Sequence, residues 1–196
     1  MTGPTGRRRA IYDPGMDFVP GDGPVMTADL FRSVLRHQAT SVVVVTAAAY
    51  PPVGFTATSF TSVSLQPPLV SFCVDLSSSS WPTVQRATYI GVHLLGDGQE
   101  ELARRFATSG VDRFAEPTVW RSGPYGVPLI PDAPAWMIGR VEDRMLAGDH
   151  AIVVVSPVFG DQNDGPRRPL VYHMGRYLTV PHPLTPGTDP SGEGVA

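Results

Sequence analysis

Apolar and hydroxyl side chains alternate along the stretch from Gly54 to Asp75, which reads GFTATSFTSVSLQPPLVSFCVD. A period of two is typical of a half-buried β-strand. The alternation slips at Phe60, which predicts a bulge or a break between two short strands. Pro67 and Pro68 predict a turn, because they remove two backbone donors, and strand-like sequence resumes at Leu69. The apolar members are expected in the core, and they are Phe55, Ala57, Val63 and Leu65.

The hydroxyl members of the same stretch leave two interpretations open. Rows of Ser and Thr are common on the solvent face of a strand. Short hydroxyls beside a small residue such as Ala57 also suit a polar, partly aromatic ligand, because they offer hydrogen bonds without a fixed charge. The hydroxyl residues are Thr56, Thr58, Ser62 and Ser64.

Further strands are predicted along the chain, at 42–46, 89–95, 136–145, 151–159, 170–172 and 177–180. The third and fourth of these are expected to pair antiparallel around a turn at Ala147-Gly148-Asp149. The Pro/Gly-rich connection at 115–134 is long for a compact domain, which makes it a candidate lid or dimer contact.

Three helix starts are predicted between these strands. Thr27 caps a helix with an apolar face (Leu30, Phe31, Val34 and Leu35) that we expect to cover an end of a barrel. Serines 77–80 before Pro82 favour a second start and also offer hydroxyls and amides to an anion. A capping box at 97–100 opens a third helix, with Leu102, Ala103 and Phe106 on its apolar face and Gly110 closing it.

Composition indicates one domain of a mainly β plan. The chain has 196 residues, 42% of them hydrophobic, with 20 Gly and 21 Pro that cluster at the termini and between strand-like runs. We expect a disordered extension at 1–26, a folded domain at 27–180 and a disordered tail at 181–196.

Charge and cysteine content exclude several classes of protein. The net charge is −3 and the basic cluster Arg7-Arg8-Arg9 lies in the predicted extension, so a nucleic-acid partner is not expected. No apolar run reaches the roughly 18 residues of a membrane span, and a signal peptide is not indicated. The single Cys73 allows no disulfide framework and no CxxC metal site, which favours a reduced, cytoplasmic setting without a metal.

A search for catalytic motifs excludes several enzyme classes. The chain has no GxSxG and no HExxH motif, and all 15 basic residues are Arg, so no lysine can bind phosphate or form a Schiff base. Gly96-Asp97-Gly98 follows a strand but has Glu101 where a Rossmann motif needs its third glycine. Chemistry carried by a bound cofactor remains open, because hydride transfer needs no catalytic triad.

The segment 54–64, followed by Pro67-Pro68-Leu69-Val70, resembles the signature of the flavin reductase family. Four later motifs resemble that family in the same order, at 103–107, 111–114, 148–150 and 169–173, so that the similarity spans about Leu30 to Val180. The resemblance implies an FMN-binding split β-barrel with a few peripheral helices that forms a homodimer. It also implies use of NADH or NADPH to supply reduced FMN or FAD to a partner monooxygenase.

The resemblance further implies which residues form the site. His150 matches the family histidine near the nicotinamide, and Arg113, read from the sequence as a free cation, is placed with Ser79 and Ser80 at the flavin phosphate. The isoalloxazine ring is placed against 56–60. The full set of expected cofactor contacts is Thr56, Ala57, Thr58, Ser59, Phe60, Ser79, Ser80, Phe106, Arg113, Phe114, His173 and Tyr177.

This chain departs from the family pattern at four positions, which are Thr58, Leu76, His93 and Val155. Two other functions fit a split barrel. One is a protein that holds flavin or another flat ligand without turnover, and the other is an oxidase similar to the pyridoxamine phosphate enzymes, whose motifs match less well.

Overall fold

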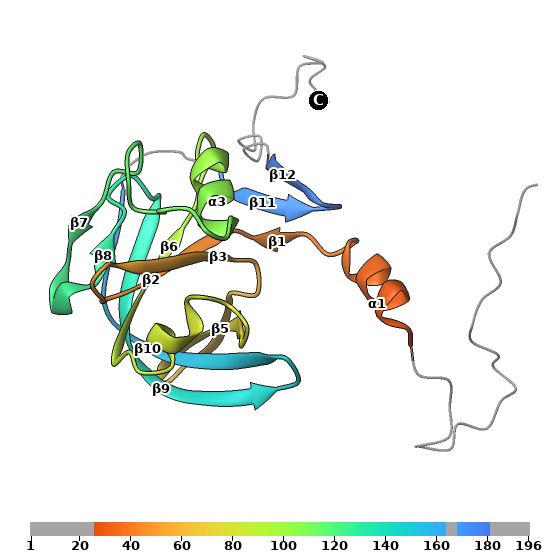
Figure 1. The fold of residues 1–196 in the computed structure, drawn as a ribbon, viewed down its shortest axis with the longest axis horizontal. Coiled ribbons are helices and arrows are strands. Elements are labelled where there is room, and N and C mark those ends of the chain that lie inside the picture. Colours follow the sequence, from red (N-terminus) through yellow and green to blue (C-terminus); the bar gives the residue numbers. More distant parts are fainter. Residues whose placement is uncertain (1–25, 164–167, 181–196) are drawn as a thin grey trace, which may run out of the picture. The chain divides into compact units, whose positions relative to one another are not determined.

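The computed structural model describes residues 26–163 and 168–180, whose helices and strands are labelled in Figure 1. The expected extension at 1–26, apart from Met26, and the expected tail at 181–196 lie outside these residues. The chain divides into two units, 1–35 and 36–196, and each is described by itself.

The described part of the first unit contains helix α1 (Ala28–Leu35). The predicted cap is confirmed, because the Thr27 hydroxyl accepts a hydrogen bond from the amide of Leu30 at 3.3 Å. Asp29 and Arg32 form an exposed ion pair one turn apart. None of the residues of α1 is buried, and the expectation that the helix covers a barrel end stays a prediction.

The second unit is built on a seven-stranded antiparallel sheet with the order β3-β2-β6-β9-β10-β5-β4. Its strands are β2 (Val43–Ala47), β3 (Val53–Ala57), β4 (Thr61–Leu65), β5 (Pro68–Asp75), β6 (Tyr89–Leu94), β9 (Ala135–Ala147) and β10 (His150–Gln162). The predicted pair of long strands and their turn are confirmed by the β9–β10 hairpin, in which Gly148 has φ +62°. Left-handed φ values of this kind favour glycine.

The sheet curls into a split barrel around one apolar core. Alternate residues of β2, β3, β5, β6 and β10 point inward, which explains the period of two in their sequences. Phe55 on edge strand β3 meets Phe72 on β5, the strand next to the opposite edge, at 6.0 Å between ring centroids, so the two halves of the sheet face each other across this core. The mainly β split barrel predicted from the sequence is confirmed.

Strand β4 corrects one expectation. Val63 and Leu65 are 53% and 84% exposed rather than buried. The reason is that β4 lies at the edge of the sheet and a register shift between Ser62 and Ser64 turns this strand away from the core. The predicted break near Phe60 is confirmed by the gap between β3 and β4.

Helix α2 (Trp81–Val84) packs Val84 into the core cluster of the barrel. Arg144 on β9 holds it there by donating hydrogen bonds to the carbonyls of Val84 and Ala87. The Ser78 hydroxyl accepts a bond from the amide of Ser80, whereas Ser80 itself makes no capping bond.

Helix α3 (Glu100–Ala107) covers the outer side of the barrel, where Ala103 and Phe106 pack against Val42 and Val44. The predicted apolar face is therefore confirmed, but both ends of the helix were predicted wrongly. Gln99 is the residue before the helix, and its side chain accepts a bond from the Gly96 amide instead of forming a capping box.

Helix α3 also ends earlier than expected, because Thr108 is already extended and Gly110 lies in the following turn at φ +76°.

The connection at 115–134 has structure of its own, with strand β7 (Arg121–Ser122), the short 3-10 helix η1 (Pro124–Gly126) and strand β8 (Pro128–Leu129). Val127 and Leu129 are buried beside Ile138 of β9. The Pro128 carbonyl accepts a hydrogen bond from the buried hydroxyl of Thr46 at 2.7 Å. The second half of the connection is thus packed on the barrel and is not a free lid.

The remaining strands form a separate sheet with the order β1-β11-β12. They are β1 (Thr40–Ser41), β11 (Leu170–His173) and β12 (Arg176–Thr179). The last two were predicted as strands, but the sequence did not indicate that they leave the main sheet.

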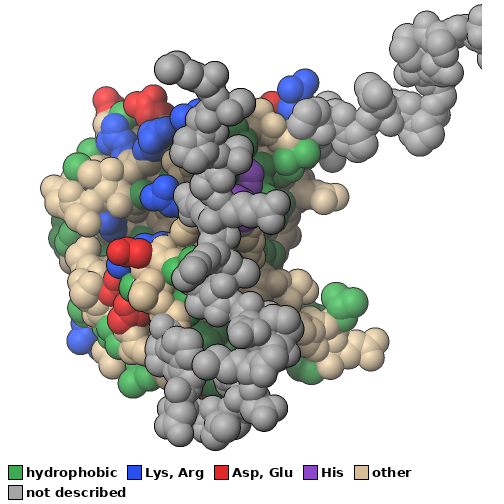
Figure 2. All heavy atoms as spheres, turned by 90° about the vertical axis from the view of Figure 1, so that its right-hand side faces the viewer, with side chains coloured by type: hydrophobic (Ala, Val, Ile, Leu, Met, Phe, Trp, Pro, Cys, Tyr) green, Lys and Arg blue, Asp and Glu red, His purple; other side chains and the backbone are tan. Residues whose placement is uncertain are grey.

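Among the described residues, no helix is long and apolar enough to cross a membrane, and no cluster of His, Cys, Asp or Glu could hold a metal ion. Figure 2 shows arginine and acidic side chains interspersed on the visible face of the described part, rather than one extended basic area.

Candidate functional site

A cavity of about 640 Å³ lies where several segments of the chain meet. These segments are the end of β3 and the residues after it, the end of β5, the serine run, the end of α3 with the loop that follows, and the start of β10. The structure brings eight of the predicted site residues to this cavity, namely Thr56, Ala57, Thr58, Ser59, Ser79, Phe106, Arg113 and His150.

Arg113 supplies the positive charge of the cavity. Its guanidinium donates hydrogen bonds to the carbonyl oxygens of Gly54 at 2.8 Å and Thr108 at 2.9 Å, and to the Ser80 hydroxyl at 3.2 Å. Arg113 is therefore not the free cation expected from the sequence, because its guanidinium is bonded to other parts of the chain. Partial burial lowers the pKa of Arg113.

Every partner of Arg113 is neutral, and within 26–163 and 168–180 no carboxylate lies within ion-pair distance of it. A half-buried guanidinium without a counter-ion is a suitable partner for an anionic group such as a phosphate.

The hydroxyls around the cavity fall into two groups. Thr56 donates to the carbonyl of Ala103 on α3 at 2.6 Å, and the Ser59 hydroxyl accepts from the amide of Cys73 at 2.8 Å, so both already have protein partners. Thr58 and Ser79 make no side-chain hydrogen bond within the described part of the chain, and both line the cavity. These two hydroxyls are free to bond a ligand.

Gly54 allows the wall of the cavity to form. A Cβ atom at this position would lie 2.7 Å from the Phe106 ring, 3.1 Å from the Phe114 ring and 3.0 Å from the Val45 carbonyl. Only glycine lets α3 and the Phe114 loop approach β3 this closely, and that approach positions Phe106 and Arg113.

His150 is the first residue of β10 and lies at the rim of the cavity, opposite Asp75 on β5 in the strand register. Its Nδ1 is 2.7 Å from a carboxylate oxygen of Asp149, and its side chain is 43% exposed. Two hydrogen bonds from Ser77 lower the pKa of the Asp75 carboxyl, with a smaller effect from His150. The imidazole therefore faces the cavity while a neighbouring carboxylate holds its orientation.

Five predicted residues do not line the cavity. Phe60 packs against the barrel core, Ser80 is buried beneath Arg113, and Phe114 packs between Phe106 and Trp120. His173 and Tyr177 lie on the small sheet, where Arg104 sits over the Tyr177 ring at 5.1 Å. Burial raises the pKa of the Tyr177 phenol.

Ser77 and Ser78, two members of the serine run that the sequence offered to an anion, also line the cavity. The sequence did not indicate four other lining residues as part of a site, namely Cys73, Asp75, Ser109 and Gly110. Asp75 could have been found, because it lies two residues before the serine run that was already a candidate. Ser109 and Gly110 were treated as the end of a helix, and their position follows from the early end of α3.

Comparison with known proteins gives concordant results. The flavin reductase like domain family matches residues 35–181. The NADH:FMN oxidoreductase of Rhodococcus qingshengii is 42% identical over 158 residues, covering 79% of this chain and 82% of that protein. The reductase subunit HsaB of a flavin-dependent monooxygenase from Rhodococcus jostii is 33% identical over 179 residues, covering 86% of this chain and 91% of that protein.

A solved structure shares the fold. The crystal structure of a flavin reductase domain protein from Arthrobacter sp. FB24 superposes with a TM-score of 0.75 at 40% identity, covering 83% of this chain and all of that one. The matched region contains the whole barrel, α3 and the small sheet. The chain therefore belongs to the flavin reductase family.

Proposed function

We propose that this protein is an NAD(P)H:flavin oxidoreductase that supplies reduced FMN or FAD to a partner monooxygenase. The observation that carries the proposal is the cavity, which combines hydroxyl-rich walls with one guanidinium that has no counter-ion in the described structure. The names of the similar proteins support it, since one is an NADH:FMN oxidoreductase and another is a monooxygenase reductase subunit.

The cavity fits a flavin in size and in chemistry. Its volume of about 640 Å³ lies within the range of roughly 300 to 1,000 Å³ that is usual for small-molecule sites. Phe55, Ala57 and Phe106 give it an apolar side, while Thr58, Ser79 and Arg113 supply hydrogen bonds and charge. These features suit a flat ring system joined to a phosphate.

In this proposal, segment 56–60 lies along the ring edge and Arg113 pairs with the phosphate, with Ser79 beside it. A bound flavin would accept a hydride from the reduced nicotinamide, so the protein has to orient the two rings and exclude water. His150, held by Asp149, would bound the nicotinamide side and keep its other ring nitrogen toward the cavity. The contribution expected from His173 and Tyr177 stays a prediction.

We also propose a homodimer formed through the outer face of β5 and β10. The inward residues of β10 are buried in the barrel, but Ile152 and Val154 on its outer side are apolar as well and only partly exposed. Met145 and Leu69 extend this outer surface. Strands that are apolar on both faces are typical of sheets covered on both sides.

His150 and Cys73 lie on the same outer side of these strands, so a second copy placed there would border the cavity. We place the protein in the cytoplasm, on the ground that its single Cys73 indicates no disulfide framework.

The test is an activity assay with the purified protein. FMN or FAD is mixed with NADH or NADPH, and loss of the reduced nicotinamide absorbance is followed against a control without protein. We expect flavin-dependent oxidation in at least one combination. Flavin binding without oxidation in any of the four would favour the non-catalytic flavin-binding alternative instead.

A further inference from the structure

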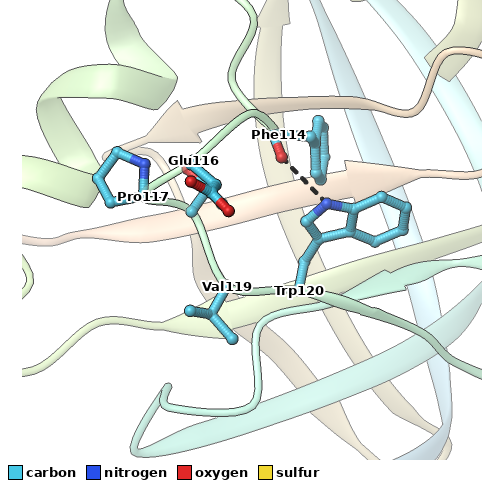
Figure 3. Close-up of a pocket in the computed structure, with 6 residues that line it drawn as sticks. Phe114, Glu116, Pro117, Val119 and Trp120 are labelled. Carbon is cyan, nitrogen blue, oxygen red and sulfur yellow. Dashed lines mark hydrogen bonds between the residues drawn. The ribbon is translucent and has the colours of Figure 1, made fainter.

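A second cleft of about 540 Å³ lies in the first half of the 115–134 connection and shares no lining residue with the cavity described above. Figure 3 shows five of its residues labelled along one continuous segment. The cleft is lined by Phe114, Glu116, Pro117, Thr118, Val119 and Trp120.

The walls of the cleft are held in place although they are exposed. The indole nitrogen of Trp120 donates a hydrogen bond to the Phe114 carbonyl at 3.1 Å, drawn as a dashed line in Figure 3. The Thr118 hydroxyl donates to the Arg113 carbonyl at 2.8 Å. Trp120 is 38% exposed and Val119 is 63% exposed. The cleft thus presents a fixed aromatic ring and an apolar side chain to solvent, which suits a flat ring as ligand.

The cleft and the cavity are joined by a row of aromatic rings. Phe106 lines the cavity and meets Phe114 at 5.2 Å between centroids, and Phe114 meets Trp120 at 5.4 Å. The Phe106 ring at the cavity and the Trp120 ring at the cleft are therefore at most on the order of 10 Å apart. An extended dinucleotide is long enough to reach from one ring to the other.

The positive charges of two arginines favour an anionic ligand that reaches from the cleft to the cavity. Arg105 donates from one guanidinium nitrogen to the carbonyls of Ala115 and Glu116 beside the cleft, while Arg113 points to the cavity. In the parts of the chain that the structure describes, neither arginine has a carboxylate partner. Arg105 can pair with a phosphate beside the cleft, and Arg113 with a phosphate at the cavity. The carboxylate of Glu116 can accept a bond from an exocyclic amine.

We propose that this cleft binds the adenine ring of an adenosine diphosphate group. The group belongs to a dinucleotide whose other half enters the cavity, either FAD or the reduced nicotinamide dinucleotide, and in this respect the inference rests on the proposed function. Trp120 stacks on the purine, Glu116 accepts from its amino group, and Arg105 pairs with the diphosphate. Arg113 contributes to the diphosphate only if the group belongs to FAD, whose flavin phosphate it holds in the proposed function.

The first experiment uses ADP as the probe and calorimetry on the full-length protein. We expect ADP to bind, and to bind on the order of tenfold more weakly to Trp120→Leu, because stacking of a base on an aromatic side chain contributes an effect of this size. Val119→Glu, at an exposed position, is expected to weaken ADP binding by charge repulsion. Tyr125→Ala removes an exposed aromatic ring of the same connection outside the cleft and is the matched control.

The second experiment identifies the source of the adenosine diphosphate group. If it belongs to FAD, the wild type binds FAD more tightly than FMN, and Trp120→Leu reduces that ratio toward one. If it belongs to the nicotinamide dinucleotide, Trp120→Leu instead reduces the difference in KM between NADH and reduced nicotinamide mononucleotide.

Undiminished ADP binding in both Trp120→Leu and Val119→Glu, or no ADP binding at all, would overturn the inference. Oxidation of NADH with FMN would still support the proposed function in that case. ADP binding without any oxidation would support the cleft and contradict the reductase.

Discussion

The charge on Arg113 is available to a ligand because its three protein partners are all uncharged. We predict that Arg113→Ala weakens flavin binding by about 1 to 3 kcal/mol, the range for a charge-assisted hydrogen bond to a phosphate. The measurement is the dissociation constant of FMN by fluorescence quenching. Riboflavin, which lacks the phosphate, should lose much less affinity.

Arg121→Ala is the control for this variant, because Arg121 is exposed on β7 outside the cavity. Equal FMN affinity in wild type and Arg113→Ala would remove Arg113 from the site.

His150 should matter to the nicotinamide substrate rather than to the flavin. We predict that His150→Ala raises the KM for NAD(P)H or lowers kcat, since hydride transfer depends on holding two rings at contact distance. Flavin affinity should change little. Steady-state constants like those of the wild type, with at most a small loss of melting temperature, would show that His150 is only a hairpin side chain.

His93 gives the fold a sensitivity to acid. It is fully buried on β6, its Nδ1 lies 3.1 Å from the Val44 carbonyl, and its Nε2 has no hydrogen-bond partner among the described residues. Burial lowers the pKa of His93 to about 4 from an ordinary 6.5, with the Val44 carbonyl opposing the change. The neutral ring is therefore the form that the folded state accepts.

As the pH falls, His93 takes up a proton in the unfolded chain before it does so in the folded protein. The contribution of His93 to the free energy of unfolding is therefore complete above pH 6.5 and falls as the pH drops toward 4. We predict a loss from this one residue of up to about 3 kcal/mol, and a His93→Asn variant whose unfolding free energy depends less on pH over this range. Urea unfolding at pH 7, 5.5 and 4.5 measures both. Parallel curves for the two proteins would contradict the prediction.

At the scale of elements, the sequence predicts where a strand lies better than it predicts the residues at which the strand ends or the strand with which it pairs. The period of two located β3 and β5, because inward residues must be apolar wherever a sheet encloses a core. The same pattern failed at β4, where edge position and a register shift overrode it. Arg113 was singled out by type, but its contacts with Gly54 and Ser80 depend on chain segments that only the folded structure brings together.

The contact between β3 and α3 offers a test of how the cavity wall is positioned. We predict that Gly54→Ala lowers the free energy of unfolding by about 1 to 3 kcal/mol, since the new methyl group would overlap the Phe106 ring and crowd the Val45 carbonyl. Ser109→Ala, at an exposed position beside the cavity, is the control and should unfold like the wild type. Flavin affinity should fall together with stability in the Gly54 variant.

At the scale of the whole molecule, the outer surface of β5 and β10 is apolar and partly exposed, so we expect a second protein copy to cover it. We predict a homodimer in light scattering, and dissociation to a monomer in Ile152→Glu, because a carboxylate in an apolar interface is costly to bury. Thr179→Glu places the same charge on the exposed end of β12 and should leave the dimer intact. A wild-type monomer at assay concentration would contradict the interface.

The cavity that we propose for the flavin is lined by segments as far apart in the chain as Phe55 and His150. No single local segment can form it, so a ligand that fills it binds the native state and not the unfolded chain. By mass action, the free energy of unfolding then rises with the ligand concentration. FMN at 100 times its dissociation constant should add about 2.7 kcal/mol. A cell short of flavin would accordingly hold more of this protein in a form that proteases recognise, which ties the lifetime of the protein to the supply of its ligand.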